Sequence, residues 1–150
     1  MNAKVEAVVN EKLSSSVDRV YDAILSEGAV RVWMAASLKE TGIEGDMKRV
    51  EIDARLGGKF FFSDQRGDTE AKHWGKYLEL DRPRRIVFTW ITDPKEESDP
   101  STVSIDLVPE GEGSQVRLMH DMDGQWADYV PRVEASWARM LRAVDSYLKG

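Results

Sequence analysis

The chain has 150 residues, enough for a hydrophobic core, and we expect a single domain over residues 1–150. Its 27 acidic and 21 basic residues give a net charge of −6, which argues against nucleic acid or an anionic membrane as partner. It has no cysteine, which excludes disulfides, thiol catalysis and thiolate metal sites. No apolar stretch approaches the ~20 residues that span a bilayer, and no basic start precedes an apolar run, so we predict a cytoplasmic protein.

The first part of the chain predicts one strand and then two short helices. Residues 5–13 alternate unevenly between apolar and polar side chains, which is typical of an edge strand or a curved strand. Ser15 with Asp18 three positions later resembles a capping box. The apolar side chains that follow recur on one helical face: Val17, Val20, Tyr21, Ile24 and Leu25. We expect Gly28 to break this helix and residues 29–36 to form the second.

The middle of the chain predicts a hairpin. After a loop at 41–46, residues 50–56 alternate strictly between apolar and charged side chains, as in a half-buried strand. Gly57-Gly58 predicts a tight turn, and Phe60-Phe61-Phe62 opens the return strand. Alternation leaves open whether Phe60 and Phe62, or instead Phe61, face the core.

Four further strands are predicted, each bounded by turn residues. The polar segment 93–100 contains two prolines, and we expect it to be an irregular, mobile loop. Gly75 lies inside a strand, which indicates a bulge or a close approach of another backbone. The strands are predicted at 70–80, 85–92, 102–108 and 115–122, with a hairpin turn at 110–113 between the last two.

The carboxy-terminal stretch, residues 128–149, predicts one long amphipathic helix. Pro131 fits its first turn, where a backbone N–H has no partner to lose. The apolar side chains recur at steps of three and four: Val130, Val133, Trp137, Met140, Leu141, Val144, Tyr147 and Leu148. A stripe of this width needs a large apolar surface to cover it. The chain therefore predicts an α+β fold, in which a curved antiparallel sheet of six to seven strands wraps around the last helix.

Several short motifs, spread over nearly the whole chain, carry a family resemblance. They are Trp33 after two short helices, Leu56-Gly57-Gly58-Lys59-Phe60, Gly75-Lys76-Tyr77-Leu78-Glu79-Leu80, Pro83-Arg84-Arg85-Ile86-Val87-Phe88-Thr89-Trp90, Val116-Arg117-Leu118-Met119-His120, and Ser136-Trp137 with Leu141. The chain thus resembles the helix-grip (START-like) superfamily of lipid-transfer domains and polyketide cyclases. Within it, the chain is most similar to homologues of the activator of the heat-shock-protein-90 ATPase. The resemblance implies a space between sheet and last helix that often holds an apolar small molecule.

Large side chains at inward-alternating positions are the candidate ligand contacts. Ligand sites in proteins are typically concave, apolar and preformed. The alternative interpretation is that these aromatic side chains simply fill the core, as they do in many small domains. We expect Trp126, just before the last helix, to pack rather than to gate the space. The predicted cavity residues are Trp33, Phe62, Tyr77, Trp90, His120, Trp137 and Met140.

The chain contains two histidines that are candidates for chemistry, His73 and His120. His120 alternates with Val116 and Leu118, so it can point inward and act as an acid, a base or a ligand contact. The plainer interpretation is a hydrogen-bonded histidine near a strand end. We expect no catalytic role for His73, which adjoins Trp74. A metal site needs several His, Asp or Glu side chains that converge, and two histidines on separate strands do not indicate one. We therefore predict no metal, no cofactor and no assigned catalytic residue.

Three functions follow from these residues and the resemblance. The first is a noncatalytic domain that binds a small hydrophobic molecule between the last helix and the sheet. The second is a protein-interaction module with a chaperone or another protein as partner. The third is a small-molecule cyclase or hydrolase that uses His120. Nucleic acid and membrane are not expected as partners, and both a monomer and a homodimer are compatible with the sequence.

Overall fold

The computed structural model describes residues 3–43 and 46–150. Within them, the strands form one antiparallel sheet in the order β1-β7-β6-β5-β4-β3-β2. The strands are β1 (Lys4–Leu13), β2 (Met47–Ile52), β3 (Lys59–Arg66), β4 (Thr69–Asp81), β5 (Arg85–Trp90), β6 (Ser101–Glu110) and β7 (Gly113–Asp123). The helices are α1 (Val17–Leu25), α2 (Glu27–Lys39) and α3 (Val130–Lys149), with 3₁₀ turns η1 (Pro94–Ser98) and η2 (Gly124–Tyr129).

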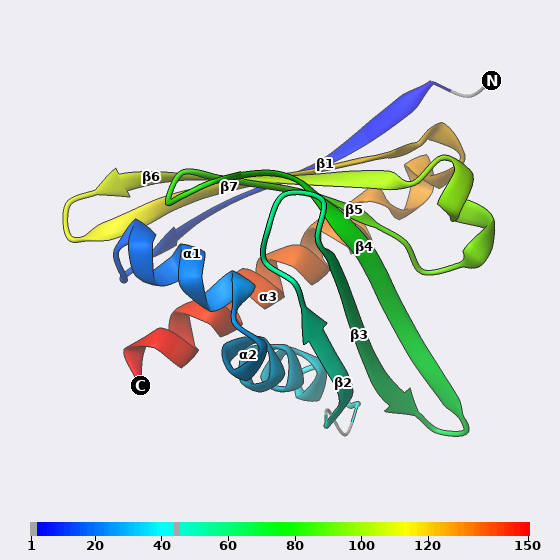
Figure 1. The fold of residues 1–150 in the computed structure, drawn as a ribbon, viewed down its shortest axis with the longest axis horizontal. Coiled ribbons are helices and arrows are strands. Elements are labelled where there is room, and N and C mark those ends of the chain that lie inside the picture. The colour runs from blue at the N-terminus through cyan, green and yellow to red at the C-terminus, as the bar shows by residue number, and fades with distance from the viewer. Residues whose placement is uncertain (1–2, 44–45) are drawn as a thin grey trace.

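Helix α3 crosses the concave side of the curved sheet, and α1 and α2 lie on the same side (Figure 1). It contacts β1, α1 and α2. Trp137, Leu141 and Val144 are its buried side chains, as the apolar stripe predicts. Tyr147, which the sequence places in the stripe, is 39% exposed, whereas the next residue, Leu148, packs against the core. The α+β helix-grip architecture is therefore confirmed.

The two amino-terminal helices have other boundaries than the sequence predicted. The side chain of Ser16, rather than Ser15, caps α1 and accepts a hydrogen bond from Arg19 N at 3.4 Å. Ser26 ends α1 and also begins α2, where its Oγ accepts from Ala29 N at 3.3 Å. Gly28 therefore lies in the first turn of α2 and does not cause the break. The Ser26 cap also explains why α2 begins earlier than position 29.

The strand predicted at 50–56 is β2, Met47–Ile52, so it begins and ends earlier. Residues 53–56 continue the alternation of apolar and charged side chains, but they lie beyond the end of the strand, and Leu56 is exposed. Gly57 has a φ of 78°, and a Cβ on Gly58 would lie 2.0 Å from the carbonyl oxygen of Asp53. The glycines therefore close a wider loop, not a two-residue turn. The loop predicted at 41–46 lies partly outside the described residues, at 44–45.

Three further features decide which side chains face α3. Phe60 and Phe62 are buried, whereas Phe61 lies on the outer face under the guanidinium of Arg49, 4.2 Å from its ring centroid. A Cβ on Gly75 would lie 2.0 Å from the carbonyl oxygen of Thr89, so β4 and β5 meet there as closely as the sequence predicts. The segment predicted as an irregular loop at 93–100 contains η1, which a capping box between Asp93 and Glu96 stabilises.

Candidate functional site

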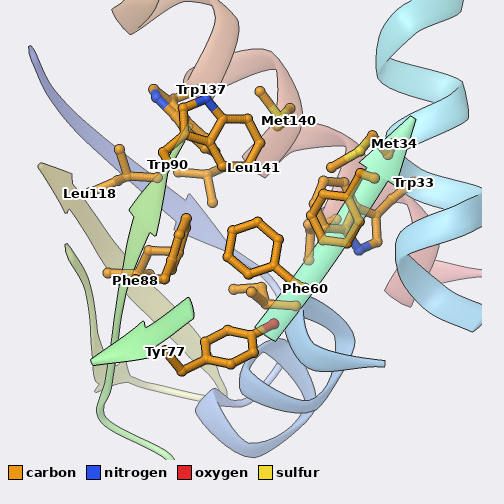
Figure 2. A pocket seen from close by; sticks show the side chains of 14 residues that line it. Trp33, Met34, Phe60, Tyr77, Phe88, Trp90, Leu118, Trp137, Met140 and Leu141 are labelled. Carbon is orange, nitrogen blue, oxygen red and sulfur yellow. The ribbon is translucent and has the colours of Figure 1, made fainter. Parts of the chain in front are cut away.

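A small space lies between α3 and the concave face of the sheet, and we call it the inner cavity. Its volume is about 40 Å³, and its lining is almost wholly apolar. The side chains come from α1, α2, the sheet and α3 and point toward a common centre (Figure 2). Six of the seven predicted side chains line it: Trp33, Phe62, Tyr77, Trp90, Trp137 and Met140. Because one water needs ~10–15 Å³ by this measure, the inner cavity holds a few waters at most.

The interior is filled mainly by aromatic rings. Phe60 stacks on Phe62 at 5.1 Å between ring centroids and meets Phe88 edge-to-face at 5.5 Å. Trp90 lies between two further rings, with His73 stacked at 5.0 Å and Trp137 edge-on at 5.1 Å. Offset and edge-to-face contacts of this kind each add about 0.5–1.5 kcal/mol beyond burial of the ring surface.

A second space, the side pocket, adjoins the inner cavity between α2, α3 and strands β3 and β4. Its volume is about 240 Å³. Trp90, Trp137, Met34 and Met140 line both spaces and so form the wall between them. The side pocket adds polar groups that the inner cavity lacks: Ser37, Thr41, Asp64, Arg66, His73 and Arg139.

A third space, the outer cleft, opens at the end of the sheet where η1 and η2 lie. Its volume is about 770 Å³, and its lining mixes polar and apolar groups. Trp126 lies at its edge, 40% exposed, and packs edge-to-face on Tyr129 at 5.6 Å between ring centroids. Trp90 lines this cleft as well as the inner cavity and the side pocket. The indole of Trp90 therefore separates three spaces.

His120 is buried, and its ring forms two hydrogen bonds to side chains. Trp137 Nε1 donates to His120 Nδ1 at 3.0 Å. Because Nδ1 accepts, the proton of the neutral ring lies on Nε2, which donates to Ser101 Oγ at 2.9 Å. Ser101 Oγ in turn donates to the carbonyl oxygen of Trp90 at 2.7 Å. Burial lowers the pKa of His120 from 6.5 to about 4.

His73 lies on β4 and faces the same side as Trp90, whereas its neighbour Trp74 lies on the outer face. Trp74 stacks on Phe61 at 6.5 Å and donates through Nε1 to Glu97 at 3.2 Å. Burial, followed by the charge of Arg66, lowers the pKa of His73 to about 4. Both histidines are therefore neutral at pH 7.

The family described as "Activator of Hsp90 ATPase homolog 1-like protein" matches residues 14–149. This chain belongs to that family. The resemblance that the sequence motifs indicated is thereby confirmed. A comparison with curated proteins gave no significant match.

Solved structures share the fold of this chain. Protein CV1439 from Chromobacterium violaceum is 22% identical, with a TM-score of 0.78 over 98% of this chain and 97% of that one. The Mll3558 protein from Rhizobium loti is 21% identical, with a TM-score of 0.75 over 98% and 99%. CalU16 from Micromonospora echinospora is 19% identical, with a TM-score of 0.65 over 97% and 85%. At these identities the likeness shows the fold alone.

In this family member, the predicted set divides between the three spaces. Only His120 lies away from the inner cavity, and it lines the side pocket and the outer cleft instead. Two residues of these spaces are not predicted from the sequence: Ser101, which orients His120, and Arg139, which lines the side pocket. Arg139 falls on the helical face next to Met140, but a charged residue there is ordinarily assigned to the solvent side.

Other site types are not seen in the part of the chain that the structure describes. No three His, Asp or Glu side chains gather there to hold a metal ion. None of the helices in that part is long and apolar enough to cross a membrane.

Proposed function

We propose that this chain is a noncatalytic binding domain for a small apolar molecule, held between α3 and the concave face of the sheet. The observation that carries the proposal is the shared wall. Trp90, Trp137, Met34 and Met140 separate an apolar inner cavity from a side pocket of about 240 Å³. That volume approaches the ~300 Å³ at which small-molecule sites begin.

The wall contains two methionines, and this favours adaptation to a guest. Met34 comes from α2 and Met140 from α3, so they approach the space from two helices. Methionine is unbranched and flexible and repacks at low cost. A guest that enters the side pocket and displaces these two side chains merges the two spaces into one site. The inner cavity alone, at about 40 Å³, accommodates no such guest.

His120 supports binding rather than catalysis. Both of its ring nitrogens are engaged, one with Trp137 and one with Ser101. A general acid or base must reach the proton that it transfers. With both nitrogens occupied and a pKa lowered to about 4, His120 serves to orient Trp137. The cyclase or hydrolase alternative and the protein-interaction alternative both stay predictions.

The test is a fluorescence titration with the neutral apolar probe N-phenyl-1-naphthylamine. Met140→Ala enlarges the space behind the wall, so we expect it to bind the probe several-fold more tightly than the wild type. Leu107→Ala is the matched control. Leu107 is equally part of the core but lines none of the spaces described above, so this variant tests for general loosening.

Saturable binding by the wild type, strengthened in Met140→Ala and unchanged in Leu107→Ala, supports the proposal. Absence of saturable binding in both the wild type and Met140→Ala contradicts it. Equal strengthening in both variants also contradicts it, because the probe then reports a loosened core rather than this site.

A further inference from the structure

Arg139 carries a buried polar atom with no partner. Its Nε is inaccessible to solvent and has no hydrogen-bond acceptor among the residues that the structure describes. A buried donor left unpaired costs free energy, more so when it is part of a charged group. Arg139 lies on α3, three residues after Ser136 and next to Met140, and all three line the side pocket. Arg139 therefore brings to the side pocket a guanidinium whose Nε the described residues leave unpaired.

The charges around the side pocket leave Arg139 uncompensated. The pocket's only carboxylate among the described lining residues is Asp64, which is buried. Arg66 already holds that carboxylate with two hydrogen bonds, from Nε at 2.7 Å and from Nη2 at 3.3 Å. His73 and His120 are neutral at pH 7. The described lining residues therefore have a net positive charge, that of Arg139.

The rest of the side pocket is apolar and aromatic. Met34, Leu38 and Met140 supply flexible aliphatic surface, and Trp90 and Trp137 supply ring faces. Ser37, Thr41 and Ser136 add hydroxyl groups to the lining. A guanidinium presents donors in a fork that matches a carboxylate, with charge-assisted bonds about twice as strong as neutral ones.

We infer that the side pocket binds a small aromatic carboxylic acid, with the carboxylate on the guanidinium of Arg139 and the ring between Trp90 and the two methionines. This inference rests on the proposed function, because it assigns a ligand class to the same site. The volume of about 240 Å³ suits an acid with one aromatic ring or with two fused rings. The carboxylate compensates the charge of the Arg139 guanidinium, for which the described lining residues offer no free carboxylate.

The test compares 2-naphthoate with 2-naphthamide, a neutral molecule of the same shape, by isothermal titration calorimetry at pH 7. We expect the wild type to bind the naphthoate at least tenfold more tightly than the naphthamide. In Arg139→Gln this preference falls below twofold, while the affinity for the naphthamide is kept. Arg142→Gln is the control, because Arg142 lies on the same helix, pairs with Glu11 at 3.0 Å and lines none of the three spaces.

Equal affinity of the wild type for both compounds overturns the inference and leaves the proposed function standing. If neither compound binds, both the inference and the proposed function are overturned. A preference that survives in Arg139→Gln also overturns the inference, since the charge then comes from elsewhere. If Arg139→Gln does not fold, the wild-type comparison and Arg139→Lys decide, and the lysine variant is expected to keep only part of the preference.

Discussion

The ring of His120 is held in one protonation state by its neighbours. Trp137 Nε1 can only donate, so a proton on His120 Nδ1 would oppose it. Protonation at low pH therefore breaks the Trp137 bond and places a charge in an apolar interior. His73, stacked on Trp90, is likewise buried as a neutral ring. These two residues tie the stability of the domain to pH.

We predict that the free energy of unfolding falls as pH is lowered from about 6.5 to about 4. Burial lowers the pKa of both His120 and His73 from 6.5 to about 4, so between these values the unfolded chain binds more protons. The contribution of these two buried, neutral rings to the free energy of unfolding is fully present above pH 6.5 and is lost as pH falls toward 4. For His120 it amounts to roughly 3 kcal/mol. Urea denaturation at a series of pH values measures it.

The matched variant for this experiment is His120→Gln, which replaces the imidazole with a side-chain amide that can still donate and accept hydrogen bonds but does not titrate. We expect its free energy of unfolding to be lower at pH 7 and to depend less steeply on pH between 5 and 6.5. A wild-type curve that is flat over that interval contradicts the assignment of a buried neutral His120.

Gly75 marks a contact that no other residue can make. Gly75→Ala places a Cβ 2.0 Å from the carbonyl oxygen of Thr89, so β4 and β5 must separate. We expect a loss of about 3 kcal/mol in the free energy of unfolding, measured by urea denaturation. Gly28→Ala is the control, in the first turn of α2. A Cβ at this position would lie no closer than 3.9 Å to another atom, so we expect the free energy of unfolding to be unchanged or to rise by up to about 1 kcal/mol. Comparable losses in both variants would contradict this account of Gly75.

At the scale of elements, α3 does more than cover the sheet, because it also protects an edge strand. β1 lies at one end of the strand order, where backbone N–H groups lack a neighbouring strand. Glu134 Oε2 accepts from Val8 N at 2.8 Å, and Asp145 Oδ1 accepts from Ser14 N at 2.9 Å. Burial raises the pKa of Asp145, but the hydrogen bonds from Ser14 outweigh it, and the pKa lies below its ordinary value.

We predict that Glu134→Ala destabilises the domain by about 1–3 kcal/mol, because it leaves the partly buried Val8 N–H without an acceptor. Thermal unfolding followed by circular dichroism measures this loss. Glu112→Ala, in an exposed hairpin turn, serves as the control and should be within about 0.5 kcal/mol of the wild type. Equal stability of the two variants would show that Glu134 does not protect this edge.

At the scale of the whole molecule, the sequence predicted the architecture well because the terminal helix and the strands carry clear periodicity. It placed six of the cavity residues for the same reason: Trp90 and Tyr77 alternate inward with their neighbours. Helix boundaries that depend on a single hydrogen bond, such as the Ser26 cap of α2, are difficult to predict from the sequence pattern. Arg139 could not be found, because a guanidinium on an amphipathic helix looks the same from sequence whether it faces water or a pocket.

The central claim is that a guest enters between α3 and the sheet, beside the wall formed by Trp90 and Trp137. The most direct measurement is a titration of the ¹⁵N-labelled protein with neutral 1-naphthol, following the indole N–H signals of the five tryptophans by NMR. The account predicts saturable shifts at Trp90 and Trp137, whereas Trp74, which lies on the outer face and donates to Glu97, keeps its position. Shifts confined to Trp74 or Trp126, or no shift at any of the five, contradict the claim.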